Sequence, residues 1–534
     1  MVKEDILKAF SSFSKLMDAA TIPGYYRDTN RSSLLQSGTA TRSNTAWKKC
    51  EYIIAYLDDE TSKHPLEDYI EGWRKITKNY DGQILFLEES KDVWGMYNSK
   101  GDNIGDTSTI TSFLSKMAPQ SSKSILSVDF NWGLFSDACL KSGLIFSDQI
   151  IQRFIASLCT KPFVICSGLS GSGKTKLAQA FVQWISESDK QYKIIPVGAD
   201  WTNREPLLGY PNGLDPKSYV TPDSGALQLI LEASKNENKP YFMILDEMNL
   251  SHVERYFADF LSIMESEEKL KLYSGEKRYT KYEEGKEPDE TYFIPHEIKW
   301  PNNLFIIGTV NIDETTYMFS PKVLDRANVI EFRITPSEMG KFFTDRKELK
   351  MKKLFLDEDK NKGGAGQSMG EHFFQLAEEK TITKIPEIEG DDNVLNKFFS
   401  ELQIVGSEFG YRTATEIELL ITKLSIDGFI DEDGKSISNN AKIDIAIMQK
   451  LLPKLHGSRK KLVGPLETLA GFCLERINES QPDEQNKIKT FYQQFISEKR
   501  DDAKWEIKYP ISFEKIERMH KNVIENGFTS YAEA

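Results

Sequence analysis

The chain contains no long apolar run. None of its hydrophobic stretches approaches the roughly 20 residues of a membrane-spanning helix, so we expect no membrane partner. Its first residues, Met1 to Lys8, mix charges and lack the apolar core of a secretory signal. These two absences argue against membrane and secreted classes of protein.

Cysteine is scarce. The five cysteines are scattered, and none forms a C-x-x-C pair. This spacing argues against a disulfide scaffold and against structural zinc, and it favours a reducing cytoplasm. Cys159 and Cys166 lie in apolar stretches, so we expect them to be buried thiols.

Positive charge is also in short supply. The 68 Lys and Arg residues are outnumbered by 81 Asp and Glu, which gives a formal net charge of −13. This balance argues against broad, non-specific coating of nucleic acid, although a local basic groove stays open. The sequence carries no internal repeat and no P-D…E-x-K constellation of a nuclease. Its 534 residues suffice for two to four domains.

What the chain does carry is a phosphate-binding motif. Residues 168–175 read Gly-Leu-Ser-Gly-Ser-Gly-Lys-Thr and match G-x-x-x-x-G-K-[ST] in full, between an apolar strand and an amphipathic helix. Glycines let successive N–H groups surround a phosphate at the positive end of a helix. The alternative is a flexible glycine turn. The nucleotide-binding residues predicted from the motif are Gly168, Ser170, Gly171, Ser172, Gly173, Lys174, Thr175 and Lys176.

A second motif is the apolar run 241–245 followed by Asp246 and Glu247. It predicts a central parallel strand with carboxylates at its carboxyl end, where open α/β sheets bind ligands. Asp246 and the Thr175 hydroxyl would hold Mg²⁺, and Glu247 would deprotonate the attacking water. A strand followed by a solvated acidic turn is the alternative for this motif taken alone.

From Lys161 to about Thr335 apolar strands alternate with helices, which predicts an α/β fold. The expected architecture is a P-loop domain with a parallel five-stranded sheet between helices, a helical lid and a separate small N-terminal domain. The predicted divisions are 1–97 (a recognition or docking domain of α+β type), 98–127 (linker), 128–335 (nucleotide-binding domain), 336–475 (lid with a mobile loop near 358–370) and 476–534 (helical extension).

The fourth strand, 303–311, ends in Asn311, where AAA+ ATPases place the polar residue called sensor 1. Runs 313–326 and 200–210, together with Asp246-Glu247-Met-Asn-Leu, resemble the McrB-like branch of AAA+ proteins. The resemblance covers roughly residues 128–470. It implies that Asn311 orients the attacking water against the γ-phosphate.

Two arginines take roles from this resemblance. Arg326 stands where AAA+ proteins carry an arginine that reaches a neighbouring subunit's γ-phosphate, and Arg412 resembles the second sensor on the helical lid. The alternatives are a surface pair between Asp325 and Arg326, and an ordinary arginine at a helix start for Arg412.

The resemblance implies a homo-oligomeric ring, expected to be a hexamer, that hydrolyses a nucleotide with Mg²⁺ and works with a McrC-like nuclease subunit on DNA. McrB uses GTP with a Met-Asn-Thr-Ala-Asp-Arg-Ser type of motif at sensor 1. Here residues 310–316 read Val-Asn-Ile-Asp-Glu-Thr-Thr, and the Arg-Ser end is missing. ATP is therefore the expected substrate, with GTP as the alternative.

Two other functions stay open. One is a remodelling ATPase of MoxR type that acts on a protein client, and the other is a nucleotide-gated interaction module without turnover. The first region bears on DNA binding, because basic residues interleave there with aromatics that suit phosphate contacts and base stacking. These residues are Tyr25, Tyr26, Arg27, Arg31, Arg42, Trp47, Lys48 and Lys49. The acidic stretch 58–71 opposes that interpretation.

Overall fold

The chain divides into two compact units, Met1–Ile125 and Leu126–Ala534. The computed structural model describes residues 19–23, 52–56, 84–90, 93–98, 100, 102–107, 109–110, 130–266, 268–281, 289–312, 317, 319–345, 347–354, 366–383, 385–390, 393–426, 428–431, 433–477, 485–500 and 503–532.

The first unit contains a mixed sheet in the order β1-β2-β3-β4-β5. Its strands are β1 (Ala19–Pro23), β2 (Tyr52–Tyr56), β3 (Ile84–Ser90), β4 (Val93–Tyr97) and β5 (Asn103–Asp106). The first three are parallel, and β4 and β5 each pair antiparallel with the strand before them. Because β5 lies inside the segment predicted as a linker, this sheet extends past residue 97.

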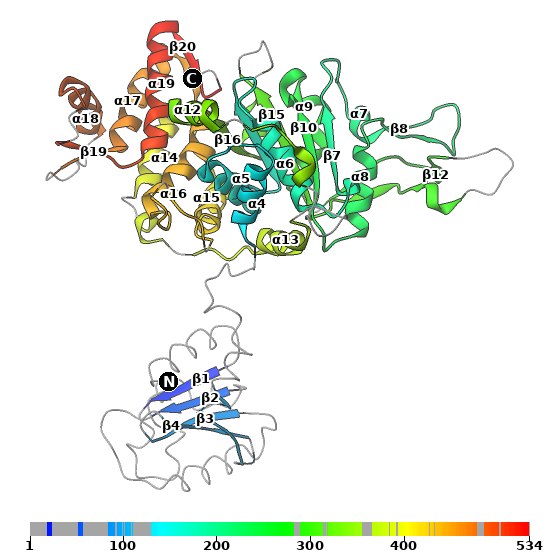
Figure 1. Cartoon of the computed structure of the whole chain (residues 1–534), viewed down its shortest axis with the longest axis horizontal. Helices are drawn as coiled ribbons and strands as arrows, with labels where there is room; N and C mark the ends of the chain where they lie inside the picture. Colours follow the sequence, from blue (N-terminus) through cyan, green and yellow to red (C-terminus); the bar gives the residue numbers. More distant parts are fainter. Residues whose placement is uncertain are drawn as a thin grey trace. The chain divides into compact units, whose positions relative to one another are not determined.

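The second unit is built on a parallel five-stranded sheet in the order β16-β6-β15-β10-β7 (Figure 1). The strands are β6 (Phe163–Gly168), β7 (Tyr192–Pro196), β10 (Tyr241–Asp246), β15 (Leu304–Asn311) and β16 (Asn328–Phe332). Continuous apolar runs such as that of β15, buried along its whole length, are typical of a parallel sheet covered on both faces. The α/β fold of the AAA+ type predicted from the sequence is confirmed.

Aromatic rings attach helices to one face of this sheet. Phe242 of β10 lies opposite Phe305 of β15 in register, and the two rings stack at 5.5 Å. Phe181 and Phe373 both pack against Phe242, at 5.8 and 6.0 Å. Phe181 lies on α6 (Lys174–Ile185) and Phe373 on α13 (Gly370–Glu378). A helix from beyond residue 335 therefore helps to cover the sheet.

The opposite face is covered by other helices. Phe163 is in register with Ile306, so it faces away from Phe305, and its ring packs at 5.6 Å against that of Phe257. Phe257 joins α9 (Val253–Tyr256) to α10 (Ala258–Ile263). The other helices that precede or flank the sheet are α4 (Trp132–Lys141), α5 (Asp148–Thr160), α7 (Glu205–Leu208), α8 (Ala226–Lys235) and α11 (Pro321–Leu324).

The C-terminal part of the second unit is helical. Its helices are α12 (Pro336–Asp345), α14 (Val394–Ile404), α15 (Tyr411–Lys423), α16 (Asn439–Ala446), the π-helical turn η10 (Ile447–Leu451), the 3-10 turn η11 (Leu452–Lys454), α17 (Arg459–Phe472), α18 (Gln485–Ser497) and α19 (Pro510–Asn526). Helix α17 packs against both α18 and α19, and β20 (Phe528–Ser530) pairs with β17 (His456–Ser458). The division predicted at residue 475 therefore falls inside one packed group, while the lid assignment of 336–475 stays a prediction.

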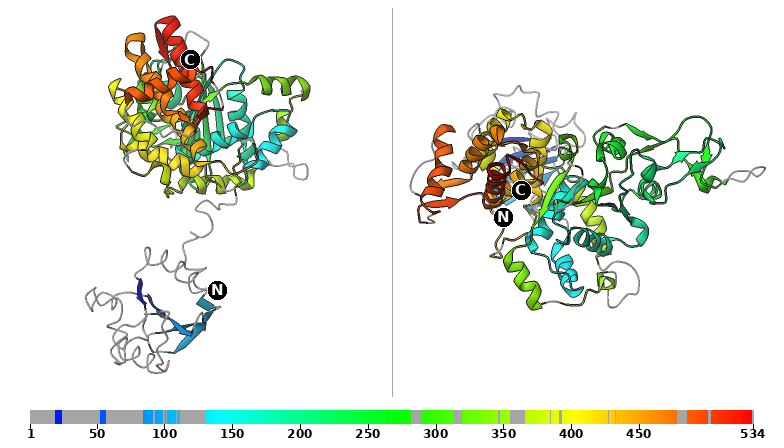
Figure 2. Two further views of the ribbon diagram at one scale, coloured as in Figure 1. Left: turned by 90° about the vertical axis from the view of Figure 1, so that its left-hand side faces the viewer. Right: turned by 90° about the horizontal axis from the view of Figure 1, so that it is seen from above.

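Short hairpins project from the end of this unit beyond β7, opposite α17–α19 (Figures 1 and 2). They are β8 (Tyr210–Pro211) with β9 (Tyr219–Val220), β11 (Lys269–Lys271) with β14 (Glu297–Lys299), and β12 (Arg278–Tyr279) with β13 (Phe293–Ile294). The pairing of β11 with β14 brings the two ends of the segment 269–299 together. Residues 358–365 of the predicted mobile loop lie outside the described residues. Among the residues that are described, no helix combines the length and apolarity needed to cross a bilayer.

Close packing of α17 on α18 depends on one glycine. A Cβ at Gly471 would lie 2.3 Å from the backbone oxygen of Ile488. We expect Gly471→Ala to lower the free energy of unfolding by about 1–3 kcal/mol in urea melts, because overpacking forces the two helices apart. Gly340 of α12 is the control, since a Cβ there meets nothing within 4 Å. Gly340→Ala should stabilise by roughly 0.5–1 kcal/mol, and equal effects of the two variants would contradict the packing argument.

Candidate nucleotide site

The phosphate loop joins β6 to α6. At Gly168 the backbone φ is +154°, and a Cβ there would lie 2.4 Å from the carbonyl oxygen of Phe332. At Gly173, the N-cap of α6, φ is +92°. Only glycine adopts both conformations without strain. The loop therefore presents backbone N–H groups at the start of a 12-residue helix, which is an arrangement that binds anions.

Lys174 lies under this loop. Its side chain is buried, and its Nζ donates hydrogen bonds to the carbonyl oxygens of Gly168 at 2.9 Å and Leu169 at 2.6 Å. The ammonium also lies 3.4 Å from the Ser172 hydroxyl. A positive charge held at the loop is what a bound phosphate requires.

The remaining predicted loop residues lie at its rim. Ser170 and Gly171 are exposed at the tip of the loop, and Lys176 is exposed on the first turn of α6. The Lys176 ammonium donates to the side chain of Gln179 at 3.2 Å. The side chain of Lys176 thus points away from the loop, so only its backbone N–H is placed to contribute there.

Cys166 lies on β6, two residues before the loop. Burial raises the pKa of its thiol to about 12, although the nearby Lys174 charge opposes the shift. The thiol is thus protonated at neutral pH and is not a nucleophile. The other described cysteines, Cys139, Cys159 and Cys473, are buried free thiols as well.

Asp246 accepts two hydroxyl hydrogen bonds on one oxygen. Thr175 Oγ1 donates to Asp246 Oδ1 at 2.7 Å, and Thr309 Oγ1 donates to the same oxygen at 2.6 Å. Hydroxyl and carboxylate oxygens are the hard ligands that Mg²⁺ prefers, and Mg²⁺ in phosphate sites usually takes only one or two protein ligands. Thr175 and Asp246 therefore fit the predicted metal role. No cluster of three or more His, Cys, Asp or Glu with metal-ligand geometry occurs among the described residues.

Glu247 follows at the strand end in a left-handed conformation, with φ of +54° and ψ of +48°. Non-glycine residues rarely adopt it, and such strain concentrates at functional sites. Its backbone N–H donates to the Thr309 hydroxyl at 3.0 Å, and its carboxylate accepts from Asn311 Nδ2 at 3.2 Å. The structure therefore brings Glu247 and Asn311 together beside Asp246, so the residue predicted as the base contacts the amide predicted to orient the water.

The two predicted arginines lie elsewhere. Both bind one carboxylate: Arg326 Nη2 lies 2.8 Å from Glu265 Oε2, and Arg412 Nη1 forms an ion pair with Glu265 Oε1. Asp325 pairs with Lys454 rather than with Arg326, so the alternative of an Asp325–Arg326 surface pair is not what the structure contains. Arg412 is in the first turn of α15, as both interpretations of it require.

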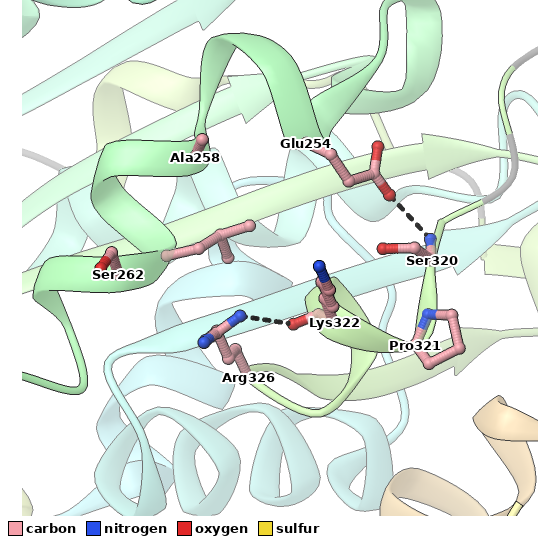
Figure 3. A pocket seen from close by; sticks show the side chains of 8 residues that line it. Glu254, Ala258, Ser262, Ser320, Pro321, Lys322 and Arg326 are labelled. Carbon is pink, nitrogen blue, oxygen red and sulfur yellow. Dashed lines mark hydrogen bonds between the residues drawn. The ribbon is translucent and has the colours of Figure 1, made fainter.

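This arginine site borders a groove of about 560 Å³ (Figure 3). The groove is lined by Glu254, Ala258, Leu261, Ser262, Ser320, Pro321, Lys322 and Arg326. Glu254 accepts from the backbone N–H of Ser320 at 2.9 Å, which fixes the entry to α11. A neighbouring hollow of about 310 Å³ includes Phe163, Glu265 and Arg412 in its lining. The second hollow lies where β6 begins, because Phe163 is part of its lining.

The phosphate loop lies at the carboxyl ends of the sheet strands, and the arginines lie at the amino ends. Phe163, which lines the hollow beside Arg412, opens β6, and Gly168 closes it. Five residues of strand span about 16 Å. The structure therefore does not bring Arg412 or Arg326 to the phosphate loop of their own chain.

Sequence reasoning missed two members of these sites. Thr309 alternates with Asn311 along β15 and lies beside Asp246, but only the register between β10 and β15 reveals this contact. Glu265 follows α10 in a run of acidic residues without a motif. No sequence signal marks its pairing with Arg412, which is 147 residues away.

Comparison with known proteins adds a curated relative. Over 179 residues the chain is 22% identical to the EcoKMcrB subunit of the type IV methyl-directed restriction enzyme of Escherichia coli strain K12. The match covers 32% of this chain and 36% of that subunit, so the chain spans about a third of the length of this relative. Over these residues the chain is similar to a McrB subunit.

This similarity agrees with the resemblance that the motifs indicate. Residues 363–528 match a domain family described as a domain of unknown function, DUF8727. Among solved structures, an ATPase-assigned protein of Cytophaga hutchinsonii is 12% identical with a TM-score of 0.37, covering 62% of this chain and 89% of that one. NtrX of Brucella abortus in complex with ADP is 10% identical with a TM-score of 0.23, covering 79% and 72%. At these scores we draw nothing further from either likeness.

Thr309 supplies the prediction for this site. Thr309→Val removes the hydroxyl that holds both Asp246 and the Glu247 backbone. We expect the Mg²⁺ concentration for half-maximal turnover to rise by roughly 10-fold or more, since loss of a residue that orients a metal ligand typically costs 10–100-fold. Thr309→Ser keeps the hydroxyl and is the control. An unchanged Mg²⁺ dependence in Thr309→Val would show that this hydroxyl does not orient Asp246.

Proposed function

We propose that the chain is an AAA+ nucleoside triphosphatase that hydrolyses ATP as a subunit of a homo-oligomeric ring. The observation that carries this proposal is the convergence of Thr175, Asp246, Glu247 and Asn311 behind the phosphate loop. Lys174 and the loop amides bind the phosphates, and Glu247 takes a proton from the water that Asn311 orients. Bound Mg²⁺, held by Thr175 and Asp246, neutralises charge on the phosphates.

Arg326 acts in a neighbouring subunit's site. Its place at the opposite edge of the sheet supports this role, because the arginine cannot reach its own phosphate loop. An arginine supplied in trans stabilises the charge of the transferring phosphoryl group and is worth about 10³–10⁵ in rate. We propose that Arg412, bound to the same Glu265 carboxylate, supplies a second positive charge to the same phosphate. We expect the closed ring to be a hexamer.

We further propose that this ring drives a McrC-like nuclease subunit on DNA in a restriction system. The similarity to a subunit of a methyl-directed restriction enzyme supports this role. The basic and aromatic residues of the first region that would contact DNA, from Tyr25 to Lys49, lie outside the described residues. The buried thiols suit a reducing cytoplasm. A MoxR-type remodelling ATPase is the second candidate, favoured by the net charge of −13.

The experiment that tests this function compares turnover of ATP and GTP, each with and without duplex DNA. We expect ATP to be hydrolysed several-fold faster than GTP, and duplex to bind with an affinity that falls as salt rises, since phosphate contacts release counterions. Faster GTP turnover would contradict the proposed substrate. Turnover indifferent to methylated and plain duplex, with no salt-dependent binding of either, would favour a protein client.

The trans role of Arg326 is tested by mixing two inactive variants. Arg326→Ala keeps an intact phosphate loop but supplies no arginine, and Glu247→Gln binds nucleotide and supplies the arginine without turning over. Each variant alone should be slow at every concentration. Their mixture should recover activity, because an Arg326→Ala subunit is complemented by its Glu247→Gln neighbour. Lack of recovery in assemblies shown by crosslinking to be mixed would contradict the trans role.

A further inference from the structure

A buried group of charged side chains contacts the turn that carries Arg326. Glu416 of α15 receives two lysines: Lys161 Nζ is 2.5 Å from its Oε1, and Lys450 Nζ is 2.5 Å from its Oε2. The side chains are 13%, 14% and 1% exposed for Glu416, Lys161 and Lys450. Three elements that are distant in sequence meet here, because Lys161 precedes β6 and Lys450 lies in the π-helical turn η10.

Electrostatics fix the charge state of this group, which we call the Glu416 cluster. Burial lowers the pKa of Lys450 to about 8, while the adjacent Glu416 opposes the shift. Burial also lowers the pKa of Lys161. Burial alone would raise the pKa of Glu416, but Lys450 and Lys161 together hold it below its ordinary value. At neutral pH the carboxylate is charged and holds both ammonium groups.

The Glu416 cluster holds the turn that carries Arg326. Lys450 Nζ donates to the backbone oxygen of Ala327 at 3.0 Å, and Lys161 Nζ lies 3.5 Å from the backbone oxygen of Asp325. Lys454, from the following turn η11, pairs with the Asp325 carboxylate. The residues on both sides of Arg326 are thus bound by lysines, whereas the Arg326 side chain itself reaches outward to Glu265.

Such a cluster is costly as a stabilising device. Buried charges lose hydration, and well-packed apolar side chains of the same volume are often as stable or more stable. A geometric role is the alternative that the contacts support: two ammonium groups, fixed by one carboxylate, specify where the Asp325–Ala327 turn lies. Fixing a backbone matters most where one side chain must meet a reacting group within a fraction of an ångström.

We propose that Glu416 is a positioning residue for Arg326: it holds Lys161 and Lys450 against the turn, so that the arginine is aimed at the neighbouring subunit's phosphate. The inference rests on the proposed trans role of Arg326 and extends it to the C-terminal helices. Glu416 lies on α15, and Lys450 and Lys454 on η10 and η11. Any shift of these helices against the sheet therefore moves the arginine.

The test distinguishes a subunit's own nucleotide site from the arginine that it supplies to its neighbour. Glu416→Gln removes the charge that holds both lysines, and it should lower turnover roughly 10- to 100-fold, since a displacement of about 1 Å can cost about 100-fold. Its own phosphate loop is at the other edge of the sheet, so affinity for a fluorescent ATP analogue should not change. The defect should lie only in the arginine that the subunit supplies to its neighbour.

Mixing reveals this asymmetry. Glu416→Gln mixed with Glu247→Gln should recover activity, because the second variant supplies a well-placed arginine to the intact site of the first. Glu416→Gln mixed with Arg326→Ala should not recover activity, because neither variant supplies a well-placed arginine. Recovery with Arg326→Ala, or no recovery with Glu247→Gln, would overturn the positioning role. The mixture of Arg326→Ala with Glu247→Gln is run in parallel, and its failure would count against the trans role itself.

Two further variants guard against misfolding. Lys454→Gln releases only the Asp325 carboxylate. It should lower turnover less than Glu416→Gln does, and it should likewise recover with Glu247→Gln but not with Arg326→Ala. Glu418→Gln, two residues along α15, is the charge-matched control, since Glu418 forms no side-chain ion pair with the 325–327 turn among the described residues, and it should behave as wild type. The proposal is wrong if Lys454→Gln folds but does not recover activity when it is mixed with Glu247→Gln. It is also wrong if Glu418→Gln lowers turnover as much as Glu416→Gln does.

Discussion

The parallel register of β6, β15 and β10 is the constraint on which the nucleotide site depends. It sets Gly168 opposite Asn311 and Leu245 opposite Gly308, so that the next residues, Asp246 and Thr309, meet at one edge. The Asp246 carboxylate can then accept hydroxyls from the phosphate-loop helix and from β15 at once. A slip of one residue in either strand would turn these side chains to the opposite face and would remove them from the phosphate loop.

The same sheet separates the two halves of the proposed reaction. Its carboxyl edge carries the loop, the metal ligands and the base, while its amino edge carries Arg326, Glu265 and Arg412. In the proposed reaction, one subunit therefore carries both halves of a catalytic site at opposite ends of its strands. Under that proposal, activity depends on assembly. It also explains why the C-terminal helices, through Glu416 and its lysines, contact the turn beside Arg326 rather than the nucleotide loop.

Local patterns in the sequence were sufficient for the loop, the acidic strand end and the parallel sheet, because glycines, apolar runs and a short motif determine each of them within a few residues. Contacts that depend on packing were not accessible. The contact of the Thr309 hydroxyl depends on the strand register, and the Glu265 pairs depend on how the chain brings Glu265, Arg326 and Arg412 together. The role of α13 in covering Phe242 and the place of β5 in the first sheet also depend on long-range pairing. Arg412 was expected at the nucleotide from resemblance alone, and its own chain places it at the other edge.

We propose that a single subunit is catalytically incomplete. The most direct measurement is ATP turnover per subunit across a protein dilution series that spans the dissociation of the assembly, with nucleotide binding per subunit followed in parallel. The account predicts turnover that rises steeply as subunits associate, while binding per subunit stays constant. Turnover per subunit that is the same in dissociated and assembled protein would contradict it.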